Sequence, residues 1–206
     1  MKKLLCVLLC ACLLAGFAGC GKKLPALNAE FIALQEACEV LNDVVWGSHG
    51  WHLVSRGEYL FAGYWRYLLR YSIAENRVDK VIVYDWPERD DYISSFSEDG
   101  RYCIAYMMDV PHGVKLSGNI LIDFEAGTAE PTKQERYPFP EDLRGIAPEQ
   151  LAAMQNLRLD LGDYVPIDEN RVGAIVPHES SNIGHHKFVV IDVEQDIIIQ
   201  ECPLNV

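Results

Sequence analysis

Short runs of aromatic and β-branched residues, separated by turn-rich segments, fill most of the chain after residue 51. Such side chains favour strands, because they fit a pleated and half-buried surface. The runs span residues 59–62, 67–71, 81–84, 102–106, 120–122 and 188–191. The pattern predicts a mainly β domain.

An internal repeat runs through the same region. Three segments, 56–62, 99–105 and 169–175, each place a tight turn before an apolar strand. A second strand that ends in a polar turn follows each of them, at residues 71–76, 122–127 and 191–196. We therefore align the three segments as copies of one hairpin-building unit.

Residues 93–102 (ISSFSEDGRY) resemble the strand and turn found in blades of WD40-like and TolB-like β-propellers. Asp99 and Gly100 accept the positive φ that a tight hairpin demands. The resemblance covers about residues 50–206 and implies a propeller-like antiparallel β-meander. At ~40–45 residues per blade this region has room for about four blades at most. Because the units are unevenly spaced, we expect an incomplete propeller and not a closed ring.

Two helices are expected beside the strands. Apolar residues recur at steps of three and four over residues 28–45, with Asn28 as the N-cap and Gly47 just beyond the end. An inserted helix is expected over about residues 148–159, with Pro148 at its first position.

The N-terminus has the three parts of a secretory signal peptide. Lys2 and Lys3 precede an apolar run over residues 4–14, and small residues follow up to Cys20. The run is too short to cross a hydrocarbon core of ~30 Å, which needs about 20 residues. We therefore expect a cleaved leader and not a permanent transmembrane helix.

Phe17-Ala18-Gly19-Cys20 resembles the lipobox of bacterial lipoproteins, with Phe17 in the usual place of Leu. The resemblance implies cleavage before Cys20, a diacylglyceryl group on its thiol, and a further acyl chain such as palmitate on its amine. Two or three chains hold a protein stably on a membrane, at ~0.8 kcal/mol per buried methylene. An ordinary cleaved signal peptide is the alternative. The expected organisation is a signal peptide at 1–19, a lipidated cysteine and stalk at 20–27, and one β-rich domain at 28–206.

The formal net charge of −12 becomes −14 when Lys2 and Lys3 are removed with the leader. A strongly acidic body disfavours nucleic acid and anionic lipid surfaces, because both attract basic faces. We expect a body that stands off the cell membrane or outer membrane on its exported side. The cysteines that follow Cys20 are expected to be buried thiols, with a bridge between the last two as an alternative: Cys38, Cys103 and Cys202.

Two groups of residues are candidate sites. A loop with His178, Glu179 and His185 offers metal-ligand chemistry, but the favoured interpretation is a polar hairpin loop between two strands. Aromatic residues crowd residues 46–71, and candidates to stack a sugar or grip a peptide are Trp51, Tyr64 and Trp65. Aromatic packing in a sheet core is the favoured interpretation of the same residues. No nucleophile elbow, phosphate loop or dinucleotide fingerprint is present in the sequence.

The sequence therefore predicts a lipid-anchored envelope protein that is a non-enzymatic binding or scaffold module without a cofactor. Its partner would be an envelope protein or a saccharide. One alternative is a metal-dependent envelope enzyme that uses the histidine loops. Another is an inhibitor or accessory protein of a second envelope component.

Overall fold

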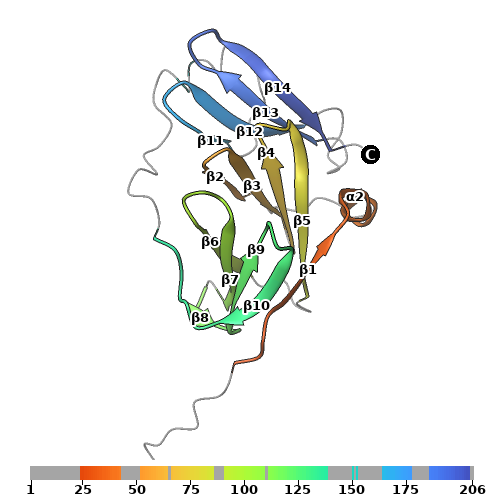
Figure 1. Ribbon diagram of the computed structural model, residues 1–206, viewed down its shortest axis with the longest axis vertical. Helices are drawn as coiled ribbons and strands as arrows, with labels where there is room; N and C mark the ends of the chain where they lie inside the picture. Colours follow the sequence, from red (N-terminus) through yellow and green to blue (C-terminus); the bar gives the residue numbers. More distant parts are fainter. Residues whose placement is uncertain are drawn as a thin grey trace, which may run out of the picture.

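The short apolar runs form strands, and the strands assemble into antiparallel sheets (Figure 1). The computed structural model describes residues 24–42, 52–64, 66–85, 91–109, 111–138, 150, 152, 164–177 and 186–204. Within this part the chain is mainly β, so the prediction of a mainly β, antiparallel fold is confirmed. The predicted signal peptide and Cys20 lie outside the described residues, as do most residues of the predicted inserted helix. Only Gln150 and Ala152 of that helix are described, and both are helical.

Each sheet is a meander in which strands pair in chain order. The first sheet contains β2 (His52–Arg56), β3 (Tyr59–Tyr64), β4 (Tyr67–Ser72) and β5 (Arg77–Asp85), with β1 (Asn28–Ile32) beside β5. The second sheet contains β6 (Asp91–Phe96), β7 (Tyr102–Asp109), β9 (Asn119–Asp123) and β10 (Thr128–Thr132), with the short β8 (Val114–Lys115) against β7. The third sheet contains β11 (Tyr164–Pro166), β12 (Arg171–Pro177), β13 (His186–Asp192) and β14 (Ile197–Pro203).

The first sheet lies between the other two, and both of its faces are buried (Figure 1). Successive residues of a strand point to opposite faces. Leu60 and Leu69 accordingly pack with Phe188 of the third sheet, whereas Phe61 packs with Phe124 of the second. The described strands form three separate sheets, and no closed barrel or ring is found among them.

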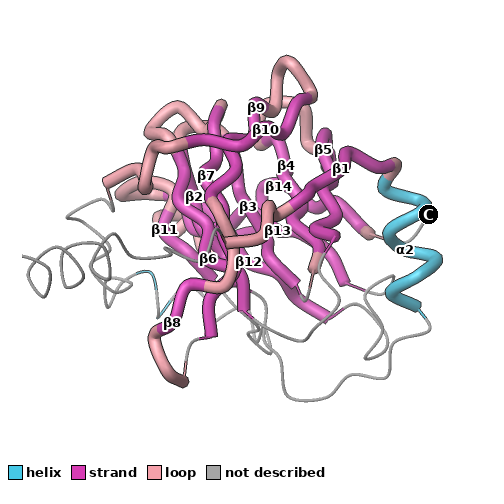
Figure 2. The backbone as a smooth tube through the Cα atoms, turned by 90° about the horizontal axis from the view of Figure 1, so that it is seen from below, coloured by secondary structure: helices cyan, strands magenta, loops and turns pink. Residues whose placement is uncertain are grey.

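The helix predicted over residues 28–45 is wrong in its first part. Residues 28–32 form β1, which pairs antiparallel with β5 from Asn28 opposite Asp85 to Ile32 opposite Val81. The helix α2 (Leu34–Asn42) begins only after this strand and lies at one side of the sheets (Figure 2). Pairing with β1 gives hydrogen-bond partners to the backbone groups at the edge of β5. The free energy gained from this pairing outweighs the helical preference that the spacing of the apolar residues indicates. Residues 43–45 of the predicted helix lie outside the described part.

The predicted boundary between the stalk, residues 20–27, and the folded domain lies too far along the chain. Gly118 N donates to Pro25 O over 2.9 Å, and Leu27 is only 1% exposed in the core between the first and second sheets. The folded body therefore includes the chain from Pro25 onward, and not only from residue 28.

The repeat seen in the sequence matches equivalent turns in the three sheets. The turns that end the second strands each contain a residue with positive φ at the same place: Asn76, Gly127 and Asp196. The first two units have the same strand register. Tyr59 lies opposite Ser72 in the first unit, and the equivalent residues Tyr102 and Asp123 lie opposite each other in the second. The third unit is offset by one residue from our alignment, because Arg171 and not Val172 lies opposite Asp192.

Candidate functional site

The candidate residues from the sequence fall almost entirely outside the described residues. These are Cys20, Trp51, Trp65, His178, Glu179 and His185. Tyr64 ends β3, where its backbone lies opposite Tyr67. In the described part of the chain, no group of three or more His, Cys, Asp or Glu residues is arranged to hold a metal ion. No helix in the same part is long and apolar enough to cross a membrane.

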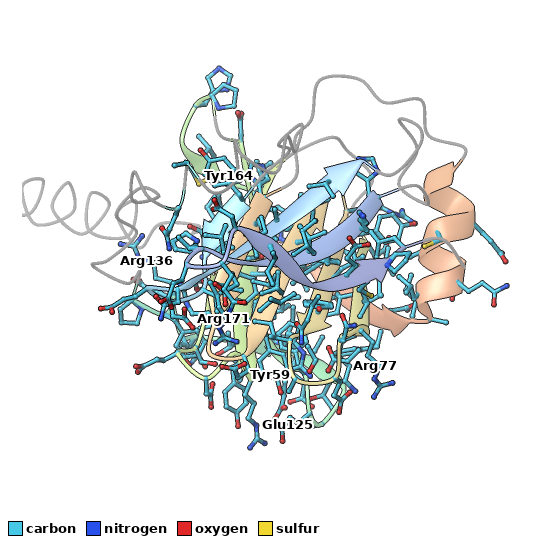
Figure 3. The ribbon with its side chains drawn as sticks, turned by 90° about the horizontal axis from the view of Figure 1, so that it is seen from above. Tyr59, Arg77, Glu125, Arg136, Tyr164 and Arg171 are labelled. Carbon is cyan, nitrogen blue, oxygen red and sulfur yellow. The ribbon has the colours of Figure 1, made fainter. Side chains whose placement is uncertain are left out.

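One end of the molecule gathers loops from all three sheets, and we call it the turn end. It comprises the loops β2–β3, β6–β7 and β11–β12 and the turns β4–β5, β9–β10 and β13–β14. Figure 3 shows Tyr59, Arg77, Glu125 and Arg171 together on this side, while Tyr164 lies toward the other. The turn end therefore presents side chains from far-apart parts of the sequence on one surface.

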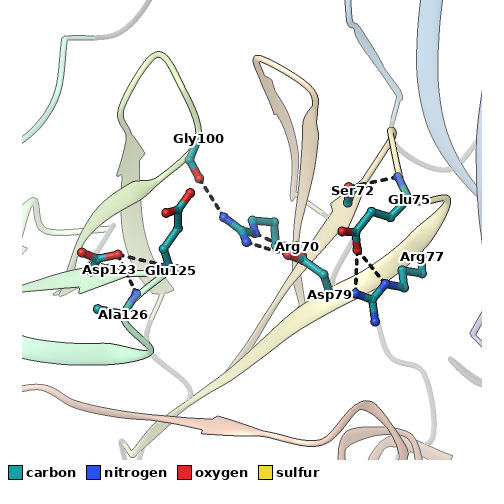
Figure 4. Close-up of polar contacts among 9 residues, drawn as sticks. All are labelled: Arg70, Ser72, Glu75, Arg77, Asp79, Gly100, Asp123, Glu125 and Ala126. Atoms are coloured by element: carbon teal, nitrogen blue, oxygen red, sulfur yellow. Dashed lines mark hydrogen bonds and ion pairs between the residues drawn. The ribbon is translucent and has the colours of Figure 1, made fainter.

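Arg70 of β4 joins the first and second sheets beneath the turn end (Figure 4). Its side chain is only 3% exposed. The guanidinium donates to both carboxylate oxygens of Asp79, from Nε over 3.1 Å and from Nη2 over 2.5 Å, and to Gly100 O from Nη1 over 3.3 Å. It also lies over the rings of Tyr59 and Phe124, with centroid distances of 4.3 and 4.9 Å. The buried charge is thus paired and hydrogen-bonded, as burial requires.

A β-bulge brings Asp79 to this position. Arg70 lies opposite Lys80 and Tyr71 lies opposite Val78, so Asp79 is the extra residue of β5. A bulge re-aims a side chain that regular pairing would place elsewhere. The third sheet has a bulge at the equivalent place, between Val190 and Ile191, where the extra residue is Ile199. The carboxylate is therefore specific to the first sheet.

Two further contacts hold the third sheet to the first near the turn end. Arg171 Nη2 donates to Glu58 Oε1 over 3.1 Å, which joins the loops β11–β12 and β2–β3. The second contact is made by Gln200 of β14, whose Nε2 donates to Ile73 O over 2.9 Å and whose Oε1 lies 3.2 Å from the Tyr71 hydroxyl. Burial raises the pKa of Tyr71 above its ordinary value, so the hydroxyl stays protonated. The loops of the turn end are accordingly fixed to one another.

Carboxylates hold the individual loops. Asp123 Oδ1 accepts from the backbone amides of Glu125 and Ala126 over 2.9 and 3.0 Å (Figure 4). These bonds, led by the one from Ala126, lower the pKa of Asp123 from 3.8. The hydroxyl of Ser97 donates to Asp99 over 2.6 Å and lowers the pKa of Asp99 in the same way.

Asp168 plays the equivalent part in the third sheet. Its Oδ1 accepts from the amides of Asn170 and Arg171 over 2.9 and 2.8 Å, and its Oδ2 accepts from Arg171 Nε over 2.7 Å. Burial raises the pKa of Asp168, but these hydrogen bonds outweigh burial and the net pKa lies below 3.8. All three loop carboxylates are therefore charged at neutral pH.

The turn end is acidic. Its basic side chains are Arg56, Arg77, Arg101 and Arg171. Its acidic side chains are Glu58, Glu75, Glu98, Asp99, Asp123, Glu125, Asp168, Glu169, Asp192, Glu194 and Asp196. A dense field of fixed carboxylates attracts basic groups and repels anions. This surface is suited to recognition of a cationic partner.

The described cysteines take no part in this surface. Cys38, Cys103 and Cys202 are free and buried, as expected from the sequence. Burial raises the pKa of Cys103 to about 12. Cys103 packs between the first and second sheets and Cys202 between the first and third, so the alternative bridge between them is not formed.

Sequence reasoning missed both Arg70 and Asp79. A signal for Arg70 was present, because a lone arginine interrupts the apolar run 67–71 in a predicted strand. No signal marked Asp79, because a bulge cannot be read from alternation. No protein-family model matches this chain, and no curated protein matches its sequence.

Proposed function

We propose that the protein is a lipid-anchored, non-enzymatic binding module of the bacterial envelope, which uses its turn end to bind a basic protein surface. The observation that carries the binding role is the set of acidic loops from three sheets that contacts through Arg70, Glu58 and Arg171 hold together. Pre-ordered loops lose little conformational entropy on binding. Less of the favourable electrostatic free energy is therefore offset by the cost of ordering the loops.

A propeller-like arrangement of the three sheets would support this role. Each of the three sheets contains four strands that pair as a meander, which is the pattern expected of a propeller blade, and the sheets follow one another in the chain. We infer an incomplete, propeller-like arrangement. Loops at one end of adjacent blades contribute to a common surface, and loops on a rigid scaffold often carry function.

The anchor in this proposal is lipid on Cys20. The motif Phe17-Ala18-Gly19-Cys20 and the charged, apolar and small-residue parts before it support export and lipidation. The acidic body would then be held on the exported side of the membrane, where its partner would be another protein of the envelope.

Photocrosslinking in living cells tests the binding role. A photoreactive phenylalanine derivative is placed at Glu125 or Glu169 on the turn end, and at Ile199 on the exposed side of β14 as the matched control. We expect discrete adducts with one envelope protein from the turn-end positions and none from Ile199. The adducts should weaken when Glu98 and Glu194 are changed to Lys. Equal adducts from all positions, or adducts indifferent to the lysine substitutions, would contradict the proposal.

A further inference from the structure

The chain enters the folded body at a defined point. Pro25 O accepts from Gly118 N over 2.9 Å, and Leu27 is buried two residues later. A fully extended chain spans at most ~3.3–3.6 Å per residue, so Cys20 lies within about 18 Å of Pro25. A lipid on Cys20 would hold this part of the body close to the bilayer surface.

A short hairpin lies beside the point of entry. β8 pairs with the end of β7, with Asp109 opposite Val114, and the chain then continues from β8 to Gly118. Val114 precedes Gly118 by only four residues, so the two lie within about 14 Å of each other. Figure 2 shows this hairpin at the opposite end of the sheets from the loop between β9 and β10.

The two segments that meet at the point of entry each carry an exposed apolar side chain. Val114 at the hairpin is 51% exposed and Leu24 in the entering chain is 41% exposed. Lys115, whose Nζ lies 4.5 Å from the centre of the Tyr106 ring, adds a cation to the same hairpin. Apolar side chains beside lysine are typical of shallow contact with the headgroup region of a membrane.

The distribution of charge favours the same orientation. The acidic side chains of the turn end lie at the other end of the strands, since β7 runs from Tyr102 at the turn end to Asp109 at the hairpin. The hairpin carries one carboxylate, Asp109, which contacts His112 over 2.8 Å, beside the cation of Lys115. An anionic bilayer therefore repels this end of the acidic body less than the turn end, and it attracts the lysines of the tether, Lys22 and Lys23.

We propose that the β7–β8 hairpin and Leu24 form a bilayer-facing surface, on which Val114 and Leu24 rest in the headgroup region of an anionic membrane. This rests on the proposed lipid anchor at Cys20. The surface fixes the orientation of the body, so that the turn end faces away from the membrane and is accessible to a partner.

Fluorescence quenching by lipids tests the orientation. The full lipidated protein is purified from membranes, reconstituted into phosphatidylcholine–phosphatidylglycerol vesicles and labelled with a small thiol-reactive fluorophore at Val114→Cys. Ile199→Cys, at a similarly exposed apolar position of 43%, and Glu125→Cys on the turn end are the matched controls. The described native thiols are buried, and the protein without an added cysteine measures their labelling.

We expect emission at position 114 to shift to the blue and to lose intensity when the acyl chains of the vesicles carry bromine, while positions 199 and 125 stay unquenched. Protein that floats with the vesicles but shows no quenching at position 114, or equal quenching at all three, overturns the orientation and leaves the anchor intact. Protein that does not float with the vesicles overturns the anchor, and the orientation fails with it. Thermal unfolding of each labelled variant checks that the fold is retained.

Discussion

At the scale of single residues, Arg70 connects the first and second sheets through charge. It is nearly fully buried, and Asp79, Gly100 O and two aromatic rings surround its guanidinium. A buried ion pair adds little net stability over an apolar pair, but removal of one partner leaves a buried charge without compensation.

Asp79→Asn should therefore destabilise the fold by about 3–5 kcal/mol, because it leaves the buried guanidinium without a carboxylate. The matched control is Glu75→Gln, which removes the pair between Glu75 and Arg77 at 53% and 66% exposure. That exposed pair should cost only ~0–1 kcal/mol. Urea denaturation followed by circular dichroism measures both, and equal costs for the two variants would show that Arg70 does not depend on Asp79.

Gly100 is constrained both by backbone conformation and by a close approach of chains. Its φ is +69°, and a Cβ there would lie 2.8 Å from Tyr59 Cδ2 and 3.0 Å from Arg56 O. Gly127 has nearly the same φ, +68°, but a Cβ there would meet nothing within 4 Å. Substitution of these two glycines therefore separates the cost of backbone strain from the cost of steric contact.

Gly127→Ala should cost about 1–2 kcal/mol from the left-handed backbone alone. Gly100→Ala should cost a further ~1–3 kcal/mol, because the β6–β7 loop must move away from the first sheet. The free energy of unfolding of the two variants gives this difference directly. If the two costs were the same, the loops β6–β7 and β2–β3 would not be in the tight contact described.

At the scale of elements, the hairpin loops depend on charged carboxylates. The pKa values of Asp99, Asp123 and Asp168 lie below 3.8 in the folded chain. A group with a lowered folded pKa stabilises the fold above its unfolded pKa, and this contribution is lost as the pH falls through the folded pKa.

We therefore expect the stability of the protein to decline as the pH falls from about 5 toward 2. Asp123→Asn keeps an oxygen that accepts from the amides of Glu125 and Ala126 but removes the titration. It should lower stability at neutral pH and make the decline in acid shallower. Thermal unfolding across this pH range measures the slope for both proteins. An unchanged slope in the variant would show that Asp123 does not titrate with folding.

The elements also show what could be predicted from the sequence. Aromatic and β-branched runs correctly located β3, β4, β7 and β13, because the composition of these strands reports burial in a sheet. Residues 28–32 were assigned to a helix, because Phe31 and Leu34 also fit a helical stripe. They form a strand because they pair with the free edge of β5, which the local sequence does not reveal. The register of the third unit was missed by one residue. The loops before the aligned strands differ in length in all three units, at residues 57–58, 97–101 and 167–170, so an alignment of these turns does not fix the register of the strands.

The acidic turn end was not predicted from the sequence, which placed the candidate residues in the histidine loop and in the aromatic segment 46–71. The net charge indicated only that the body as a whole is acidic. The acidic loops meet at one end because the sheets stack on one another. Stacking depends on tertiary contacts, such as the contact between Leu60 and the third sheet. The pairing of Arg70 with Asp79 required a bulge, for which the sequence carries no local signal.

At the scale of the whole molecule, the two ends of the strands differ in charge and in chain connections. The chain enters near Gly118 and β8, whereas the acidic loops lie at the turn end. An anchor at one end and a binding surface at the other would keep the partner's site away from the bilayer. This arrangement gives the charge asymmetry of the body a physical role.

The lipid anchor on Cys20 can be tested by intact mass spectrometry of the protein extracted from membranes. We expect a mature chain that begins at Cys20 and carries the added mass of a diacylglyceryl group and an acyl chain. Cys20→Ala should give only the unprocessed and unacylated precursor. A mature chain that begins at another residue without acyl groups, or normal processing of Cys20→Ala, would show that Cys20 does not anchor the protein.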